Sequence, residues 1–252
     1  MKTRILSAVL AVLMLAACFA FAGCNKDDEK VLVMGTNAYF PPYEYFEGDD
    51  IIGIDAEIAG EIAKKLGMTL KIENMEFDTI LNAVESGAVD FGMAGMTVTE
   101  KRLEQVNFST SYATGVQAII VPVDSPITTV DDLFAEGATY RVGVQLGTTG
   151  DIYASDDFAE TGVTVTQYPN GNNAVVALNG GDIDCIIIDN EPAKAFVAAN
   201  EGLKVLDTSY ADEDYAIAIK KENEQLLADI NKAIDELMAD GTIDRIIAKY
   251  IK

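Results

Sequence analysis

Short apolar runs alternate with stretches of helical periodicity along most of this chain. An apolar run of about five residues is typical of a strand that is buried on both faces, whereas apolar residues three and four apart mark one face of a helix. The alternation favours βα units around a largely parallel sheet. The expected strands are Val31–Gly35, Met68–Ile72, Val89–Ala94, Tyr140–Val144, Val163–Tyr168, Cys185–Ile188 and Tyr215–Ile219.

Four segments carry the helical pattern. Their expected spans are Asp55–Leu66, Asp78–Glu85, Leu226–Leu237 and, as a last short helix, Thr242–Tyr250. Glycine stands after three of them, at Gly67, Gly87 and Gly241. A helix commonly ends at such a residue, because the left-handed conformation of a C-cap suits glycine.

Two extended segments stand where one series of elements gives way to the next. They are Val116–Val123 and Tyr215–Ile219, and no Gly/Ser-rich linker separates the series. If both segments cross between two lobes, residues 31–116 and 215–252 form the first lobe, and residues 117–214 form a hinge strand and the second lobe. Two crossings constrain a hinge more than one tether does, so we expect the lobes to open and close on one another.

The first two dozen residues have the layout of a secretory signal. Two basic residues precede an uncharged run, Ile5–Gly23, that ends in small residues before Cys24. A membrane-spanning helix is the competing interpretation of this run, and a leader with incidental cysteines is another. The residues around Cys24 resemble a bacterial lipobox, which predicts a signal peptide at 1–23, lipidation at Cys24 and a polar tether at 24–30. The residues before Cys18 resemble a lipobox as well, so Cys18 is the alternative.

Composition narrows the classes of function. The 252 residues hold 18 Lys and Arg against 41 Asp and Glu, a formal charge of −23, and loss of residues 1–23 with their two basic groups makes it −25. Such a chain repels a polyanion, which excludes a nucleic-acid partner. Because the sequence has no His, it excludes His-based triads and His-ligated zinc.

Two further features of the composition concern the body of the chain. Cys185 is the one cysteine after Cys24, so no disulfide is expected inside the body. The acidic run Asp212–Asp214 lacks the spacing of a calcium loop. We interpret it as a solvated loop.

Five motifs follow one another along the body: Asn37–Glu44, Gly53–Ile58, Gly95–Arg102 with Phe108-Ser109, Gly147–Gly150 and Asp184–Asp189. Together they resemble the amino-acid-binding proteins of ABC importers, the bacterial extracellular solute-binding protein family 3. The resemblance covers residues 31–252. It implies an α/β, two-lobed periplasmic-binding fold of the Venus-flytrap type, in which each lobe is a mostly parallel sheet flanked by helices and two strands form the hinge.

The resemblance implies a site for the two charged groups of an amino acid. Arg102 presents a planar fork suited to a carboxylate, and the matching Arg of the family holds the ligand's α-carboxylate. Thr97 and Thr149 are expected to hold the same group, Thr149 from a loop that opens a helix and offers free N–H groups. Asp189, together with Gly95 and Thr97, is expected to accept the α-ammonium. The alternatives are a surface ion pair for Arg102 and a helix N-cap for Asp189.

Aromatic and amide residues are expected around the ligand's side chain. The expected contacts are Asn37, Phe40, Tyr43, Phe77 and Gln145. In the family the positions of Phe40 and Phe77 sandwich that side chain, and many relatives carry Asp at the position of Asn37. The neutral amides of Asn37 and Gln145 favour a polar uncharged ligand such as glutamine, whereas Glu44 leaves a basic ligand open.

These expectations describe an extracytoplasmic receptor, anchored to the bacterial membrane by its lipid, that delivers a free amino acid to an ABC permease. We expect a monomer that uses no cofactor or metal ion and does not turn its ligand over. One rival is an enzyme of the same fold, similar to cyclohexadienyl or arogenate dehydratases, with Glu191 beside Asp189 as general acid. A second rival is a ligand-sensing module or an adhesin.

Overall fold

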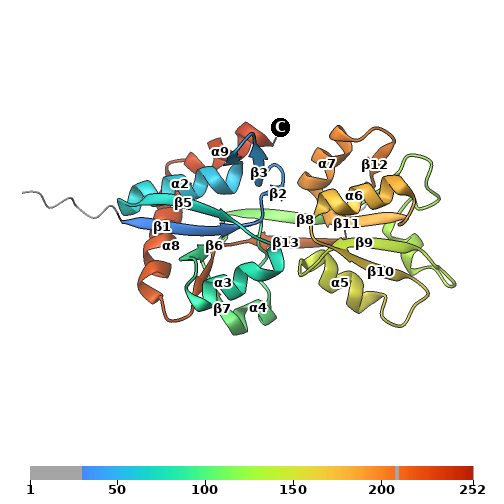
Figure 1. Ribbon diagram of the computed structural model, residues 1–252, viewed down its shortest axis with the longest axis horizontal. Helices are drawn as coiled ribbons and strands as arrows, with labels where there is room; N and C mark the ends of the chain where they lie inside the picture. The colour runs from blue at the N-terminus through green and yellow to red at the C-terminus, as the bar shows by residue number, and fades with distance from the viewer. Residues whose placement is uncertain (1–29, 208–209, 252) are drawn as a thin grey trace, which may run out of the picture. The chain divides into compact units, whose positions relative to one another are not determined.

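The computed structural model describes residues 30–207 and 210–251. The expected signal peptide, the lipidation candidates Cys24 and Cys18 and most of the expected tether lie outside the described residues. From Leu32 onwards the chain is an α/β protein with two lobes, as predicted (Figure 1). Of the helices in the described part, none is long and apolar enough to cross a membrane.

The first lobe is built on a five-stranded sheet. Its strands are β1 (Val31–Thr36), β5 (Thr69–Asn74), β6 (Phe91–Gly92), β7 (Val106–Phe108) and β14 (Ala218–Lys220). They lie in the order β5-β1-β6-β14-β7. β1 and β6 are parallel, whereas β14 is antiparallel to both of its neighbours. The sheet is therefore mixed rather than mostly parallel, because the chain returns to it from the second lobe in the opposite direction.

Helices cover both faces of the first sheet. They are α2 (Ile54–Leu66), α3 (Ile80–Ser86, after a 3-10 turn at Phe77–Thr79), α4 (Glu100–Gln105), α8 (Glu224–Ala239) and α9 (Thr242–Tyr250). On one face Ile62 and Ile234, from α2 and α8, share a buried cluster with Phe91 of the sheet. On the other face Ile80 of α3 packs in a separate cluster with Ala218. α2 and α3 end at left-handed glycines, Gly67 and Gly87, as predicted.

The second lobe has a six-stranded sheet. Its strands are β8 (Ala113–Pro122), β9 (Arg141–Gln145), β10 (Thr164–Tyr168), β11 (Cys185–Asp189), β12 (Leu203–Val205) and β13 (Ala211–Tyr215). The order is β10-β9-β11-β8-β12, and β13 also pairs with β8. β9, β10 and β11 are parallel, whereas β8 is antiparallel to β11, β12 and β13. This sheet is mixed too, since β8 and β13 carry the chain between the two lobes.

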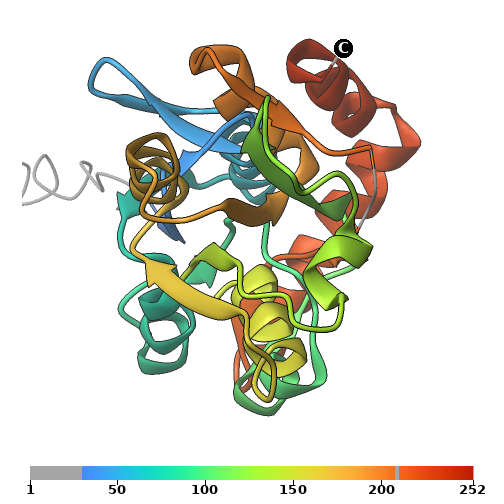
Figure 2. The ribbon, with the colours of Figure 1, turned by 90° about the vertical axis from the view of Figure 1, so that its right-hand side faces the viewer.

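Helices also lie on both faces of the second sheet. They are α5 (Thr149–Asp157), α6 (Gly171–Gly180) and α7 (Asn190–Ala199), with a 3-10 helix at Val130–Phe134. Figure 2 shows α5 on one side of the strands and α6 and α7 on the other. Alternate residues of β11 divide between the faces: Ile187 packs with Ala154 of α5, and Ile186 packs with Ala174 of α6. A strand buried on both faces explains why its sequence is apolar without alternation.

The chain changes sheets inside the apolar run predicted as one strand, Tyr215–Ile219. β13 ends at Tyr215 in the second sheet, and β14 begins at Ala218 in the first. Between them the Ala216 N–H donates to the carbonyl of Met96, and the Ile217 carbonyl accepts from the Ser109 N–H. The predicted single strand is wrong because both sides of the switch are buried, so the hydrophobic pattern does not mark it.

The acidic run Asp212–Asp214 is not a solvated loop, because it lies within β13. Its residues alternate as strand residues do: Asp212 and Asp214 are exposed, and Glu213 between them is buried at 5% exposure. This buried carboxyl is one of the residues that surround the site described below.

A small third sheet carries the first sequence motif. It consists of β2 (Tyr39–Phe40), β3 (Glu44–Glu47) and β4 (Asp50–Ile52), paired antiparallel. The light-blue β3–β4 hairpin is visible in Figure 2. β2 and β3 bring Phe40 and Glu44 to the cavity between the lobes.

Candidate ligand-binding site

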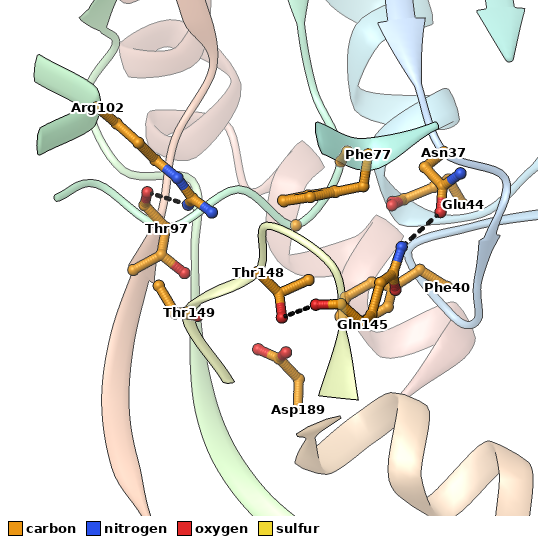
Figure 3. A pocket seen from close by; sticks show the side chains of 12 residues that line it. Asn37, Phe40, Glu44, Phe77, Thr97, Arg102, Gln145, Thr148, Thr149 and Asp189 are labelled. Carbon is orange, nitrogen blue, oxygen red and sulfur yellow. Dashed lines mark hydrogen bonds between the residues drawn. The ribbon is translucent and has the colours of Figure 1, made fainter. Parts of the chain in front are cut away.

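A small cavity lies between the two lobes. Residues of the first lobe form one wall, and the loop after β9, the start of α5 and the end of β11 form the other. Arg102, Thr97 and Thr149 gather at one end, and Asn37, Glu44 and Gln145 at the other (Figure 3). The lining residues are Asn37, Phe40, Glu44, Phe77, Ala94, Gly95, Thr97, Arg102, Gln145, Thr148, Thr149 and Asp189.

Arg102 is the cation of this cavity. It lies in the first turn of α4, whose N-cap Thr99 accepts a hydrogen bond from the Arg102 N–H. Its guanidinium donates to the carbonyl of Thr97 at 2.7 Å and to that of Gly147, in the opposite lobe, at 3.0 Å. The group also lies 5.5 Å from the ring centre of Phe77. Burial lowers the pKa of Arg102, and the nearby carboxylates oppose that shift, so the group stays charged.

Gly95 and Thr97 form the part of the cavity wall next to Arg102. Gly95 has φ 52°, and a Cβ there would lie 2.8 Å from the Phe40 ring, so a larger residue would be both strained and crowded. Its N–H donates to a carboxylate oxygen of Asp55 at 2.9 Å. That bond anchors Gly95, whose own carbonyl is expected to face an ammonium group.

The start of α5 supplies hydrogen-bond donors from the second lobe. Thr148 caps the helix by accepting the Asp151 N–H, and Thr149 is the first helical residue, at 3% exposure. The first N–H groups of a helix have no partner within it and favour an anion. Since Arg102 bonds to Gly147 just before this turn, a carboxylate at this end of the cavity meets donors from both lobes.

Asp189 supplies a carboxylate from the opposite side. It is the last residue of β11 and the residue before α7, but its side chain does not cap that helix. One oxygen accepts from the phenol of Tyr215, and the other accepts from the Gln117 amide at 2.8 Å. Burial, followed by the negative charge of Glu213, raises the pKa of Asp189 well above its usual value. A cation placed beside it would favour the ionised form.

The far end of the cavity is lined by amides, aromatic rings and one carboxyl. The Asn37 amide donates to the Met75 carbonyl at 2.7 Å and accepts from Gln145 at 3.0 Å, a bond that joins the lobes. Both amide nitrogens are therefore committed to protein acceptors. Glu44 is fully buried, and its two oxygens receive no donor from the described residues.

Glu44 faces a second buried carboxyl, Asp55. Asp55 also accepts hydrogen bonds from the Gly95 N–H and the Tyr112 hydroxyl. Burial raises the pKa of Asp55 to about 6, although these two donors lower it. Burial, followed by the charge of Asp55, raises the pKa of Glu44 well above its usual value. The pair therefore retains a proton more readily than an exposed carboxyl does.

Most residues predicted from the motifs line this one cavity. Tyr43 does not: its ring packs edge-on against Tyr215, at a centroid distance of 5.1 Å, beside a different cavity. Glu191, the acid of the enzyme alternative, is paired with Lys194 and lines that other cavity as well. Neither side chain therefore contributes to the wall around Arg102 and Asp189.

The sequence reasoning missed the residues behind Asp189. Gln117 was a visible signal, because it is a lone amide in the apolar stretch of β8 and is fully buried. Glu213 was hidden in the acidic run that we interpreted as solvated. Tyr215 was expected only as a strand residue. Their role depends on which strands pair in the sheet, and the order of residues along the chain does not reveal that pairing.

Comparison with known proteins agrees with this architecture. Residues 32–252 match the family described as bacterial extracellular solute-binding proteins, family 3. The arginine-binding extracellular protein ArtP of Bacillus subtilis is 32% identical over 250 residues, covering 95% of this chain and 96% of that protein. The L-cystine-binding protein TcyJ of Escherichia coli K12 is 31% identical over 256 residues, covering 97% and 94%.

Solved structures show the same fold. An ancestral arginine-binding protein bound to arginine superposes with a TM-score of 0.83 at 38% identity, covering 89% of this chain and 99% of that one. An ancestral arginine-binding protein bound to glutamine gives 0.82 at 37% identity, with 88% and 98% covered. The family match spans both lobes and every residue of the cavity wall. This chain belongs to family 3 of the bacterial extracellular solute-binding proteins.

Proposed function

We propose that this chain is an extracytoplasmic receptor that captures a free α-amino acid between its lobes. The observation that carries the proposal is one buried Arg and one buried Asp in a single small cavity, supplied by opposite lobes. Arg102, Thr97 and the start of α5 at Thr149 would hold the α-carboxylate. Asp189, with the backbone of Gly95 and Thr97, would hold the α-ammonium.

The ligand's side chain would lie between Phe40 and Phe77 and point towards the amide end of the cavity. The neutral amides of Asn37 and Gln145 support a polar uncharged ligand, with glutamine as the first candidate. Arginine is the second candidate, and a specific observation favours it: Glu44 is a buried carboxyl in the wall with no donor from the described residues. A guanidinium would supply donors there. The names of the relatives include arginine-binding proteins.

Capture would close the lobes about β8 and β13, with the boundaries expected near residues 116 and 215. Because the carboxylate and the ammonium each meet groups of both lobes, the ligand binds the closed form more tightly than the open form, as a conformational switch requires. Moving such an equilibrium from about 1:99 to 99:1 takes about 5 kcal/mol of differential binding.

The closed receptor would deliver its amino acid to an ABC permease, as the names of the relatives support. It would act as a monomer held at the membrane by a lipid on Cys24, with Cys18 as the alternative. Turnover by a dehydratase-like activity is the rival, and the position of Glu191 outside the cavity wall weighs against it. The ligand-sensing alternative differs in its partner and not in its site.

Calorimetric titration of the chain from residue 24 against the twenty amino acids tests this function. We expect one or a few amino acids to bind at a single site and to raise the unfolding temperature, because a ligand of the native state stabilises it by mass action. If none of the twenty binds, the receptor function is wrong.

The variant Glu44→Gln separates the two ligand candidates. It should weaken binding of arginine by about tenfold or more, through loss of a charged partner, and change binding of glutamine by much less. Glu47→Gln, an exposed carboxyl of the same strand β3, is the matched control and should leave both affinities unchanged. Equal losses for both ligands in Glu44→Gln would contradict a side-chain contact.

A further inference from the structure

Four polar side chains form a buried cluster on the second-lobe sheet, behind the cavity. Gln117 comes from β8, Asp189 from β11, and Glu213 and Tyr215 from β13. Strand register brings them together, because Asp189 lies beside Gln117 and Glu213 lies beside Gly115 of β8. Since all four belong to one sheet, the cluster does not depend on closure of the lobes.

Gly115 provides the space that this cluster needs. A Cβ at that position would lie 2.2 Å from the phenolic oxygen of Tyr215. Without it, the Tyr215 hydroxyl reaches Asp189 and donates a hydrogen bond. The Gln117 amide then uses its nitrogen for two acceptors, Asp189 at 2.8 Å and Glu213 at 3.1 Å. The cluster therefore holds both carboxyl groups in fixed positions.

The two carboxyl groups lie against one donor. Asp189 and Glu213 are 6% and 5% exposed, and one oxygen of each accepts a hydrogen bond from the same Gln117 amide nitrogen. Two ionised carboxylates buried this close repel each other, so the doubly charged state is disfavoured. The buried Oε1 of Glu213 receives no donor from the described residues. One proton held between the two carboxyls removes one of the two negative charges.

The other titratable groups that face the pair do not supply this proton. Arg102, across the cavity, stays charged. Tyr153 on α5 and Tyr43 and Tyr215 beside the pair are phenols whose pKa values are raised, chiefly by burial, so they stay protonated near neutral pH. Glu44 acts on Asp189 from the first lobe, but its own pKa is raised well above its usual value, chiefly by burial. The cluster therefore contains one pair of acids that can release a proton.

We propose that Asp189 and Glu213 share one proton, and that the α-ammonium of the amino acid displaces it on binding. This rests on the proposed function, because it needs an ammonium beside Asp189. The O–H bond of the shared proton breaks, the proton passes to solvent, and the incoming ammonium replaces its positive charge. Affinity then increases with pH wherever the proton is released, by up to about tenfold per pH unit for one proton.

Calorimetry in buffers of different ionisation enthalpy counts the released protons. L-Arginine and L-glutamine serve as probes between about pH 5 and 7.5, below the titration of their own α-ammonium groups. We expect about one proton per bound ligand for the wild type over part of this range. Glu213→Gln keeps an oxygen for Gln117 but has no titrating group, so it should bind and release almost none. Asp212→Asn, exposed on the same strand, is the control and should match the wild type.

Each outcome has a separate meaning. Binding by the wild type without proton release anywhere in this range overturns the proposal and leaves the receptor function intact. Release that persists in Glu213→Gln assigns the proton to another group, such as the Glu44–Asp55 pair, and overturns it too. If no amino acid binds, the proposed function and this proposal are both wrong. The pH dependence of the wild-type dissociation constant tests the proposal even if Glu213→Gln does not fold.

Discussion

Arg102 is held by carbonyls of both lobes, through bonds to Thr97 and Gly147. Because the Arg102 guanidinium is already oriented and buried, it loses little conformational freedom when a carboxylate binds to it. The identity and position of this side chain therefore matter more than its charge alone.

Replacing Arg102 tests this at the residue scale. Arg102→Ala should weaken amino-acid binding by about 3 kcal/mol or more, roughly a hundredfold, because it removes charge-assisted bonds from a buried site. The neighbouring Lys101→Ala is the control, since Lys101 is exposed, and should bind as the wild type does. Calorimetry measures both. An unchanged affinity in Arg102→Ala would mean that the carboxylate binds elsewhere.

The raised pKa of Asp55 predicts how the stability of the folded chain depends on pH. Its pKa in the folded chain is about 6, above the unfolded value of about 4, so the folded state binds the proton more tightly. That contribution to stability is present below about pH 4 and is lost as the pH rises through about 6. Asp55→Asn keeps an oxygen for the Gly95 N–H and removes the titration.

Urea unfolding at several pH values checks this. The free energy of unfolding of Asp55→Asn, relative to the wild type, should rise by up to about 3 kcal/mol between about pH 4 and 7. Asp49→Asn, an exposed residue near the same hairpin, should give a curve parallel to that of the wild type. Parallel curves for Asp55→Asn as well would contradict the assignment.

Much of the candidate site was predictable at the level of single residues. The motifs named Arg102, Thr97, Thr149 and Asp189, and these four side chains line one cavity. Glu213 was not predictable as a site residue, because its burial depends on pairing with β8 and its neighbours are charged. A sequence pattern relates residues that are near one another along the chain. The residues around Asp189 and Glu213 are close only in the folded structure.

At the scale of elements, α4 is a six-residue helix that carries Arg102. So short a helix has little intrinsic stability, so its cap matters. Thr99→Ala removes the acceptor of the Arg102 N–H and should cost about 1 kcal/mol of stability, with weaker ligand binding. Thr99→Ser should restore both. Thermal unfolding and calorimetry measure them, and full binding by Thr99→Ala would show that packing alone positions the helix.

The strands and helices were largely predictable, whereas the sheet to which each strand belongs was not. Met68–Ile72 and Cys185–Ile188 lie close to β5 and β11, because apolar runs bounded by turns identify buried strands. The prediction of a single strand at Tyr215–Ile219 was wrong, because the chain passes there from one buried sheet to the other without a charged residue to mark the change. The direction of the strands was not predictable either, because a pattern of buried residues is the same for a parallel and an antiparallel strand.

The whole molecule is expected to close around its ligand. Fluorescent labels at Lys101→Cys in the first lobe and Asp156→Cys in the second, both exposed positions, measure the distance between lobes. The labelled chain starts after Cys24, and Cys185 would not take up the label, because its thiol is buried and burial raises its pKa to about 12. We expect energy transfer to increase at saturating ligand, and no change in Arg102→Ala. Equal transfer with and without ligand would contradict closure.

The bonds from Gln145 to Asn37 and from Arg102 to Gly147 join protein atoms to protein atoms across the cavity. They therefore favour the closed form whether or not an amino acid is bound. As a result, the ligand-bound and ligand-free receptors differ less in their population of the closed form. An importer that responds only to the closed form would occasionally be activated by an empty receptor. It would then hydrolyse ATP without transporting an amino acid. Weakening the Gln145–Asn37 bond should reduce such idle cycles at some loss of affinity.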